Sequence, residues 1–106
     1  MPKPIKFHPS AVREAGAAYR WYAARSERAA EQFADALERA VAQVAERPDS
    51  FPGHLANTKR CLLTRYPFLV VFQELADAIE VIGLPTAVGG RGTGRDASNE
   101  VSWHRV

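Results

Sequence analysis

The sequence predicts an α+β domain in which an N-terminal strand and a two-helix hairpin pack on a small antiparallel sheet. Apolar residues recur every three or four positions between residues 10 and 47, which is typical of helices with one buried face. Short apolar runs separated by turn residues follow between residues 59 and 82, as in a strand meander. Helices and strands that are segregated along the chain indicate an α+β fold.

A short strand and a first helix are expected at the N-terminus. Ile5 and Phe7 alternate with polar neighbours up to Pro9, as in a half-buried strand. Ser10 stands where a helix N-cap belongs, since its hydroxyl can accept from a free amide of the first turn. A helix over about residues 10–25 then presents an apolar stripe of Val12, Ala15, Tyr19 and Tyr22.

A second helix should follow almost without a linker. Ser26 repeats the capping signal, and Glu27 favours the positive end of the helix dipole. The stripe of this helix consists of Ala30, Phe33, Leu37, Ala40, Val41 and Val44. Pro48 ends the helix because proline cannot continue it. Two helices joined so closely should form an antiparallel hairpin.

The second half of the chain should form the sheet. Residues 48–58 are rich in turn formers and indicate a loop. Strands are expected over residues 59–65, 68–72 and 79–82. The unbroken apolar run of 68–72 predicts burial on both faces and therefore a central strand.

The pattern assigns a core and divides the chain into two parts. Side chains expected to be mostly buried are Val12, Tyr19, Tyr22, Phe33, Leu37, Val41, Leu62, Val70, Phe72 and Val81. Residues 1–84 form the predicted domain, and residues 85–106 form an irregular tail. This tail should pack poorly from Pro85 onward, because its glycines are costly to order and few apolar side chains offset that cost.

Composition limits the class of protein. The chain of 106 residues is 46% hydrophobic and 25% charged, as in one folded domain. A net charge of +2 permits an anionic partner without requiring one. Cys61 cannot form an internal disulfide, and no apolar run reaches the length of a membrane helix, so we expect a cytoplasmic protein.

The sequence contains no motif for a metal, a phosphate or a catalytic nucleophile. Its histidines are scattered at positions 8, 54 and 104. We therefore expect no metal and no cofactor, and catalytic residues stay unknown.

The candidate target-binding residues lie in one basic segment, which contains Lys59, Arg60, Arg65 and Tyr66. Arginine can grip phosphate or carboxylate through two parallel hydrogen bonds, and an aromatic ring can stack on a base. The alternative is a solvated strand face with a turn tyrosine. Strict alternation also places Arg60 and Arg65 on opposite faces of a strand unless a bulge intervenes.

An ordered set of short motifs resembles the RelE/ParE family of toxins, especially its plasmid-stabilisation branch. The matching residues are Phe7-His8-Pro9, Trp21-Tyr22, Ala30, Phe33 and Leu37, Pro48 with Phe51-Pro52, Lys59-Arg60, Leu62-Leu63, Arg65-Tyr66-Pro67-Phe68 and Val70-Val71-Phe72. The resemblance implies a growth-inhibiting toxin of a bacterial toxin–antitoxin pair that a cognate antitoxin neutralises. It also implies a target, which is either DNA gyrase or messenger RNA cleaved on the ribosome.

The tail departs from this family, whose members usually end in a histidine, several arginines, a proline and an aromatic residue. Written in GC-rich codons, the stretch from Leu84 to Gly94 reads Ala-His-Gly-Arg-Arg-Arg-Pro-Gly-Tyr-Trp in a shifted frame. We therefore hypothesise that residues 85–106 are a frame-shifted tail. The alternative function is a non-toxic, antitoxin-binding remnant that has lost its effector ending.

Overall fold

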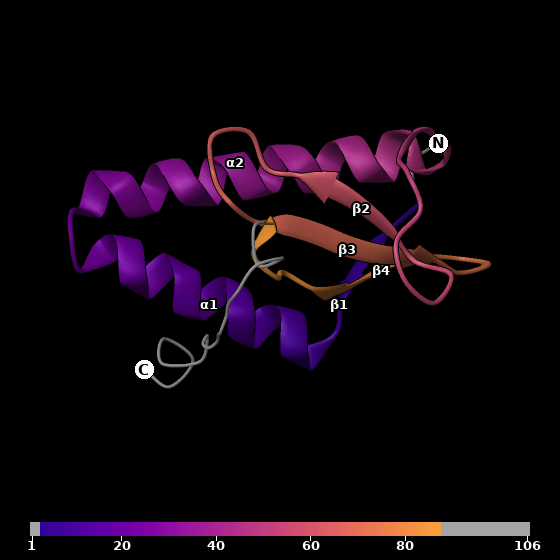
Figure 1. Ribbon diagram of the computed structural model, residues 1–106, viewed down its shortest axis with the longest axis horizontal. Helices are drawn as coiled ribbons and strands as arrows, with labels where there is room; N and C mark the ends of the chain where they lie inside the picture. The colour runs from indigo at the N-terminus through magenta and orange to yellow at the C-terminus, as the bar shows by residue number, and fades with distance from the viewer. Residues whose placement is uncertain (1–2, 88–106) are drawn as a thin grey trace.

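The computed structural model describes residues 3–87 and confirms the predicted α+β fold (Figure 1). Its elements are β1 (Ile5–Phe7), α1 (Pro9–Ala23), α2 (Glu27–Glu46), the short 3-10 helix η1 (Pro48–Ser50), β2 (Lys59–Leu62), β3 (Leu69–Glu74) and β4 (Ile79–Gly83). The two helices form the expected antiparallel hairpin, with α1 lying along β1 and β4 and α2 along β2.

The four strands form one mixed sheet in the order β1-β4-β3-β2. The meander of β2, β3 and β4 is antiparallel, as predicted, and β3 is an inner strand. The expectation of a wholly antiparallel sheet is wrong, because β1 pairs with β4 in parallel, with Phe7 opposite Val81. A parallel pair needs a long crossover connection, and here the crossover from β1 includes both helices and the first two strands of the meander.

The N-cap predicted from the sequence is correct for α2 and wrong for α1. Ser26 caps α2 as predicted, accepting a hydrogen bond from the Ala29 amide at 3.0 Å. The N-cap of α1 is His8 rather than Ser10, because Pro9 already occupies the first helical turn. The Nδ1 atom of His8 accepts from the Ser10 amide at 3.0 Å. The Ser10 hydroxyl instead donates to the Ile82 carbonyl at 2.8 Å and ties α1 to the end of β4.

The core contains most of the side chains that the sequence assigned to it. Phe33, Val70, Phe72 and Val81 are at most 1% exposed. Tyr22, Leu37 and Val41 are half-buried.

Three core assignments are wrong: Val12 is 57% exposed, Tyr19 40% and Leu62 60%. Val12 and Tyr19 are exposed because α1 packs against the rest of the domain through its alanines. Ala11, Ala17 and Ala18 are buried, so the larger stripe is turned outward. In the other case, Leu62 is the last residue of β2, an outer strand, and its side chain points away from those of its buried neighbours Cys61 and Leu63.

The chain beyond β4 continues along the sheet for three more residues. The Leu69 amide donates to the Pro85 carbonyl and the Ala87 amide to the Pro67 carbonyl, and Thr86 bridges Phe68. Glu14 on α1 accepts a hydrogen bond from the Leu84 amide at 2.6 Å. The side chains of residues 85–87 are exposed, in agreement with the predicted poor packing, although their backbone is paired. The rest of the proposed tail, residues 88–106, lies outside the described residues.

Candidate functional site

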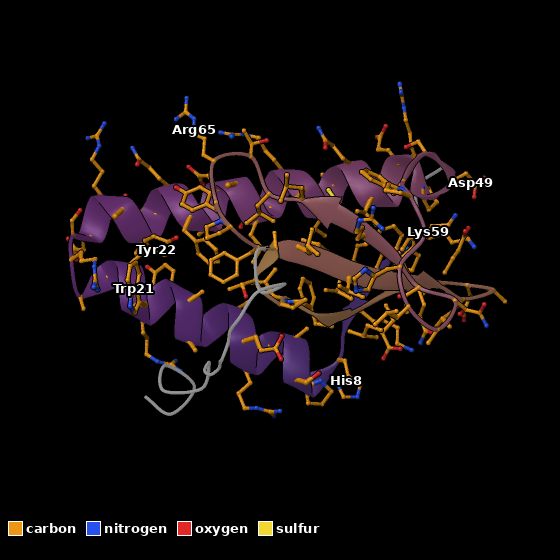
Figure 2. The ribbon with its side chains drawn as sticks, in the orientation of Figure 1. His8, Trp21, Tyr22, Asp49, Lys59 and Arg65 are labelled. Carbon is orange, nitrogen blue, oxygen red and sulfur yellow. The ribbon has the colours of Figure 1, made fainter. Side chains whose placement is uncertain are left out.

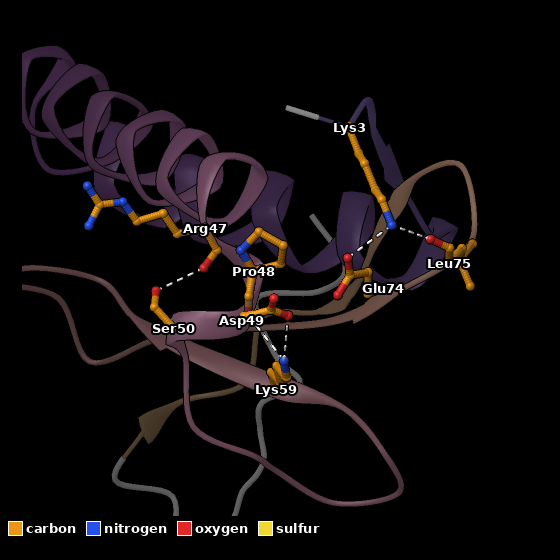
Figure 3. Close-up of polar contacts among 8 residues, drawn as sticks. All are labelled: Lys3, Arg47, Pro48, Asp49, Ser50, Lys59, Glu74 and Leu75. Atoms are coloured by element: carbon orange, nitrogen blue, oxygen red, sulfur yellow. Dashed lines mark hydrogen bonds and ion pairs between the residues drawn. The ribbon is translucent and has the colours of Figure 1, made fainter. Parts of the chain in front are cut away.

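The first two basic candidates, Lys59 and Arg60, hold the loop that precedes β2. The Lys59 ammonium lies 3.7 Å from the Asp49 carboxylate and donates to the Pro48 carbonyl at 3.3 Å (Figure 3). The Arg60 guanidinium donates to the Gly53 carbonyl. Both side chains are thus engaged in contacts within the domain, which leaves them less free to grip an external anion.

The other two candidates, Arg65 and Tyr66, lie in the turn between β2 and β3. Arg65 is not on a strand, so strand alternation does not govern where it lies relative to Arg60. Its backbone has a φ of 74°, a left-handed conformation that costs a non-glycine residue energy. The side chain points into solvent (Figure 2) and makes no hydrogen bond or ion pair within residues 3–87.

Tyr66 belongs to an aromatic cluster near the loop that joins α1 to α2 (Figure 2), made up of Trp21, Tyr22, Phe33, Tyr66 and Phe68. The Tyr66 ring meets Tyr22 and Phe33 edge-on, at centroid distances of 5.5 and 5.6 Å. Tyr22 stacks on Phe33 at 5.2 Å. These contacts hold the Tyr66 ring in place and leave it half-buried.

Sequence reasoning did not assign a role to the outermost member of this cluster, Trp21, or to its partner Arg25. Trp21 is 43% exposed, and the Arg25 guanidinium lies over its ring, 3.5 Å from the centroid. Such a cation over an aromatic face is a favourable contact. The signal was present in the sequence, since residues four apart on a helix are neighbours.

Two grooves flank the turn. An apolar groove of about 240 Å³ is lined by Ala18, Trp21, Tyr22, Pro67, Phe68 and Thr86. A polar groove of about 520 Å³ separates α2 from the end of β2 and the turn, with Gln32, Asp35 and Arg39 on one side and Leu62 and Arg65 on the other. Arg65 and Tyr66 therefore lie on a surface that combines a free cation, aromatic rings and two concave regions.

Among residues 3–87, this surface offers binding groups and no histidine. His8 caps α1, and the backbone amide of His54 donates to the Thr58 carbonyl within the loop at 2.7 Å. Residues 3–87 contain no group of three side chains suited to a metal ion, and no helix in that range could cross a membrane.

Burial raises the pKa of the Tyr22 phenol above its ordinary value; the neighbouring Tyr66 phenol adds to this rise, and the Arg25 guanidinium opposes it. The folded protein thus keeps Tyr22 protonated to a higher pH than the unfolded chain does. Above the ordinary tyrosine pKa of about 10, the unfolded chain binds fewer protons and stability falls with rising pH. We expect Tyr22→Phe to show a shallower fall in urea midpoint above this pH; identical slopes for the two proteins would contradict the assignment.

The fold and this surface define a small α+β protein with a candidate binding surface around the Arg65–Tyr66 turn. The chain matches the family described as the ParE toxin of the type II toxin–antitoxin system parDE over residues 5–84, and it belongs to that family. It is thus a ParE toxin of a type II toxin–antitoxin system, neutralised by its antitoxin.

A solved structure supports the fold. The chromosomal ParDE toxin–antitoxin system from P. aeruginosa contains a chain with a TM-score of 0.59 and 19% sequence identity. The similarity covers 79% of the present chain and 95% of that one. No curated protein sequence matches the chain.

Proposed function

We propose that this toxin inhibits growth by binding DNA gyrase in the cytoplasm. One observation favours DNA gyrase over ribosome-bound messenger RNA, the two targets that the family resemblance implies. RNA cleavage requires groups that move a proton from the 2′-hydroxyl. Within residues 3–87 no histidine lines the grooves beside the Arg65–Tyr66 turn, and the one carboxylate that does, Asp35, lies across the polar groove and forms no ion pair with Arg65. Inhibition of gyrase requires only a binding surface.

The binding surface we assign consists of Arg65, Tyr66 and the exposed Trp21. Tyrosine, tryptophan and arginine are the residues that most often dominate binding energy at protein interfaces. The packing of Tyr66 on Tyr22 and Phe33 reduces the ordering cost of binding, because the ring is already held. Lys59 and Arg60 are left out of this surface, because their side chains hold the loop before β2.

A supercoiling assay with purified gyrase tests the proposal. We expect the toxin with the family-type ending to inhibit supercoiling, and Arg65→Ala to weaken inhibition by about tenfold or more, as for loss of an interface arginine. Arg13→Ala is the matched control, because Arg13 is an exposed arginine on α1. Cleavage of ribosome-bound messenger RNA without any effect on gyrase would overturn the proposal.

The second candidate function is a non-toxic, antitoxin-binding remnant, and the tail favours it. The family match ends at residue 84, and residues 85–106 contain no run of arginines followed by proline and an aromatic residue. In this form the chain retains the folded domain and lacks the effector ending, whether through a shifted frame or through divergence.

A further inference from the structure

The turn between β2 and β3 contains a backbone conformation that an arginine rarely adopts. The Tyr66 amide donates to the Leu63 carbonyl at 3.4 Å, so residues 63–66 form a four-residue turn with Arg65 in the third position. A positive φ at this position usually belongs to glycine or asparagine. Arg65 nevertheless adopts it, with a φ of 74°. The fold alone would therefore favour glycine here.

The residues on either side hold this turn in place. Leu63 is 1% exposed and Phe68 6%, and the Leu63 amide donates to the Phe68 carbonyl at 3.0 Å. The Tyr66 ring is fixed by its two aromatic neighbours in the cluster. Because both flanks are anchored, the backbone of Arg65 cannot relax to a more favourable conformation without loss of these contacts.

The Arg65 side chain contributes no polar contact to the fold. It is exposed, points into solvent (Figure 2) and forms no hydrogen bond or ion pair within the described part of the chain. A strained residue without a partner in its own domain is expected where a binding partner uses it, because backbone strain that persists is concentrated at binding sites. The anchored turn also lowers the ordering cost of binding, since the backbone is already fixed.

The charge around Arg65 limits the kind of partner. Helix α2, which forms the opposite wall of the polar groove, has five acidic and two basic residues, and its Asp35 lines the groove itself. A nucleic-acid backbone carries a negative charge at every phosphate, so this wall repels it. A single carboxylate on a protein surface can reach Arg65 without running along α2, and a guanidinium binds a carboxylate through two parallel hydrogen bonds.

We propose that the turn between β2 and β3 is a strained recognition site, in which the Arg65 guanidinium binds a carboxylate of gyrase. The left-handed backbone projects the side chain toward the target and lowers the stability of the free toxin. Arg65 therefore has opposite effects on two properties, because its side chain strengthens binding and its backbone weakens the fold. The inference rests on the proposed function, in which gyrase is the partner.

Melting temperatures of the full chain test the strain. We expect Arg65→Gly to raise Tm by about 4 °C, because glycine adopts a positive φ without steric cost. Arg65→Ala keeps a non-glycine residue in this conformation and should leave Tm within about 2 °C of the wild type. Ala56→Gly is the matched control and should also raise Tm, since Ala56 is exposed in the loop before β2 and has a φ of 52°. A Tm of Arg65→Gly at or below that of the wild type overturns the strained turn.

Calorimetry with purified gyrase in the absence of DNA tests the carboxylate contact, with the version of the toxin that has the family-type ending. We expect Arg65→Gly and Arg65→Ala to weaken binding to a similar extent, by about tenfold. Arg65→Lys keeps the charge without the two parallel hydrogen bonds and should lose most of the same affinity. Ala56→Gly should bind like the wild type.

Three outcomes contradict the proposal in different ways. Full affinity of Arg65→Gly for gyrase overturns the contact. Binding of a short DNA duplex that falls with Arg65→Ala would show that Arg65 binds phosphate, which overturns the carboxylate. No binding of gyrase by the wild type overturns the proposed function and the contact together, while the melting temperatures still decide whether the turn is strained.

Discussion

Replacing Phe33 by alanine should remove about 3–5 kcal/mol from the free energy of unfolding. Phe33 is 1% exposed and is the centre of the aromatic cluster, with its ring against those of Tyr22, Tyr66 and Phe68. Truncation removes the buried area and leaves a cavity that the surrounding rings fill only in part. Because a small domain has roughly 5–15 kcal/mol of stability in total, the loss should be evident in a urea unfolding curve.

The control for this substitution is Leu55→Ala, since Leu55 is 76% exposed in the loop before β2. Surface truncations of this kind usually change stability by less than about 0.5 kcal/mol. Equal unfolding midpoints for Phe33→Ala and the wild type would refute the assignment of the core. Loss of the folded state altogether would agree with it.

Expression of the chain without antitoxin should arrest growth weakly or not at all, and shifting the coding frame after Ile82 should give strong arrest. Residues 85–87 pair with the chain beside the aromatic cluster, and Thr86 lines the same groove as Trp21 and Tyr22. The shifted frame replaces the residues after Ile82 by an ending that contains a histidine, three arginines and two aromatic residues, which supplies the groups that the resemblance to the family implies for activity. The present tail contains glycines at these positions instead.

The comparison uses two versions that share residues 1–82, expressed from the same promoter and checked for equal protein levels. Introducing Phe33→Ala into the shifted version is the internal control, since arrest that depends on the fold should then be lost. Equally strong arrest by both versions would show that the ending is not needed. Normal growth with both would favour the non-toxic remnant in either frame.

The sequence predicted the elements that depend on long apolar stripes and standard caps. Ser26, Phe33 and the central strand were assigned correctly, because their local patterns agree with their tertiary surroundings. The orientation of α1 was not, since periodicity could not tell that the helix would pack through alanines and turn Val12 and Tyr19 outward.

The candidate site was predicted only in part, because its parts meet through tertiary packing. In the sequence, Lys59 and Arg60 belong to one basic segment with Arg65. In the structure, Lys59 and Arg60 bind the loop before β2, whereas Arg65 points into solvent. The parallel pairing of β1 with β4 likewise depends on how the two helices pack on the sheet, which local sequence patterns do not specify. The contact between Trp21 and Arg25 could have been found from their spacing of four residues in the helix expected over residues 10–25, although α1 itself ends at Ala23.

Relief of growth arrest by the antitoxin is the most direct test of the central claim, that this chain is the toxin of a type II toxin–antitoxin pair. The measurement is the growth rate of cells that express the shifted version, with and without the cognate antitoxin under separate control. The account predicts arrest without the antitoxin and near-normal growth with it, together with a stable complex of the two proteins. Arrest that persists unchanged when both proteins are present at equal levels would contradict it.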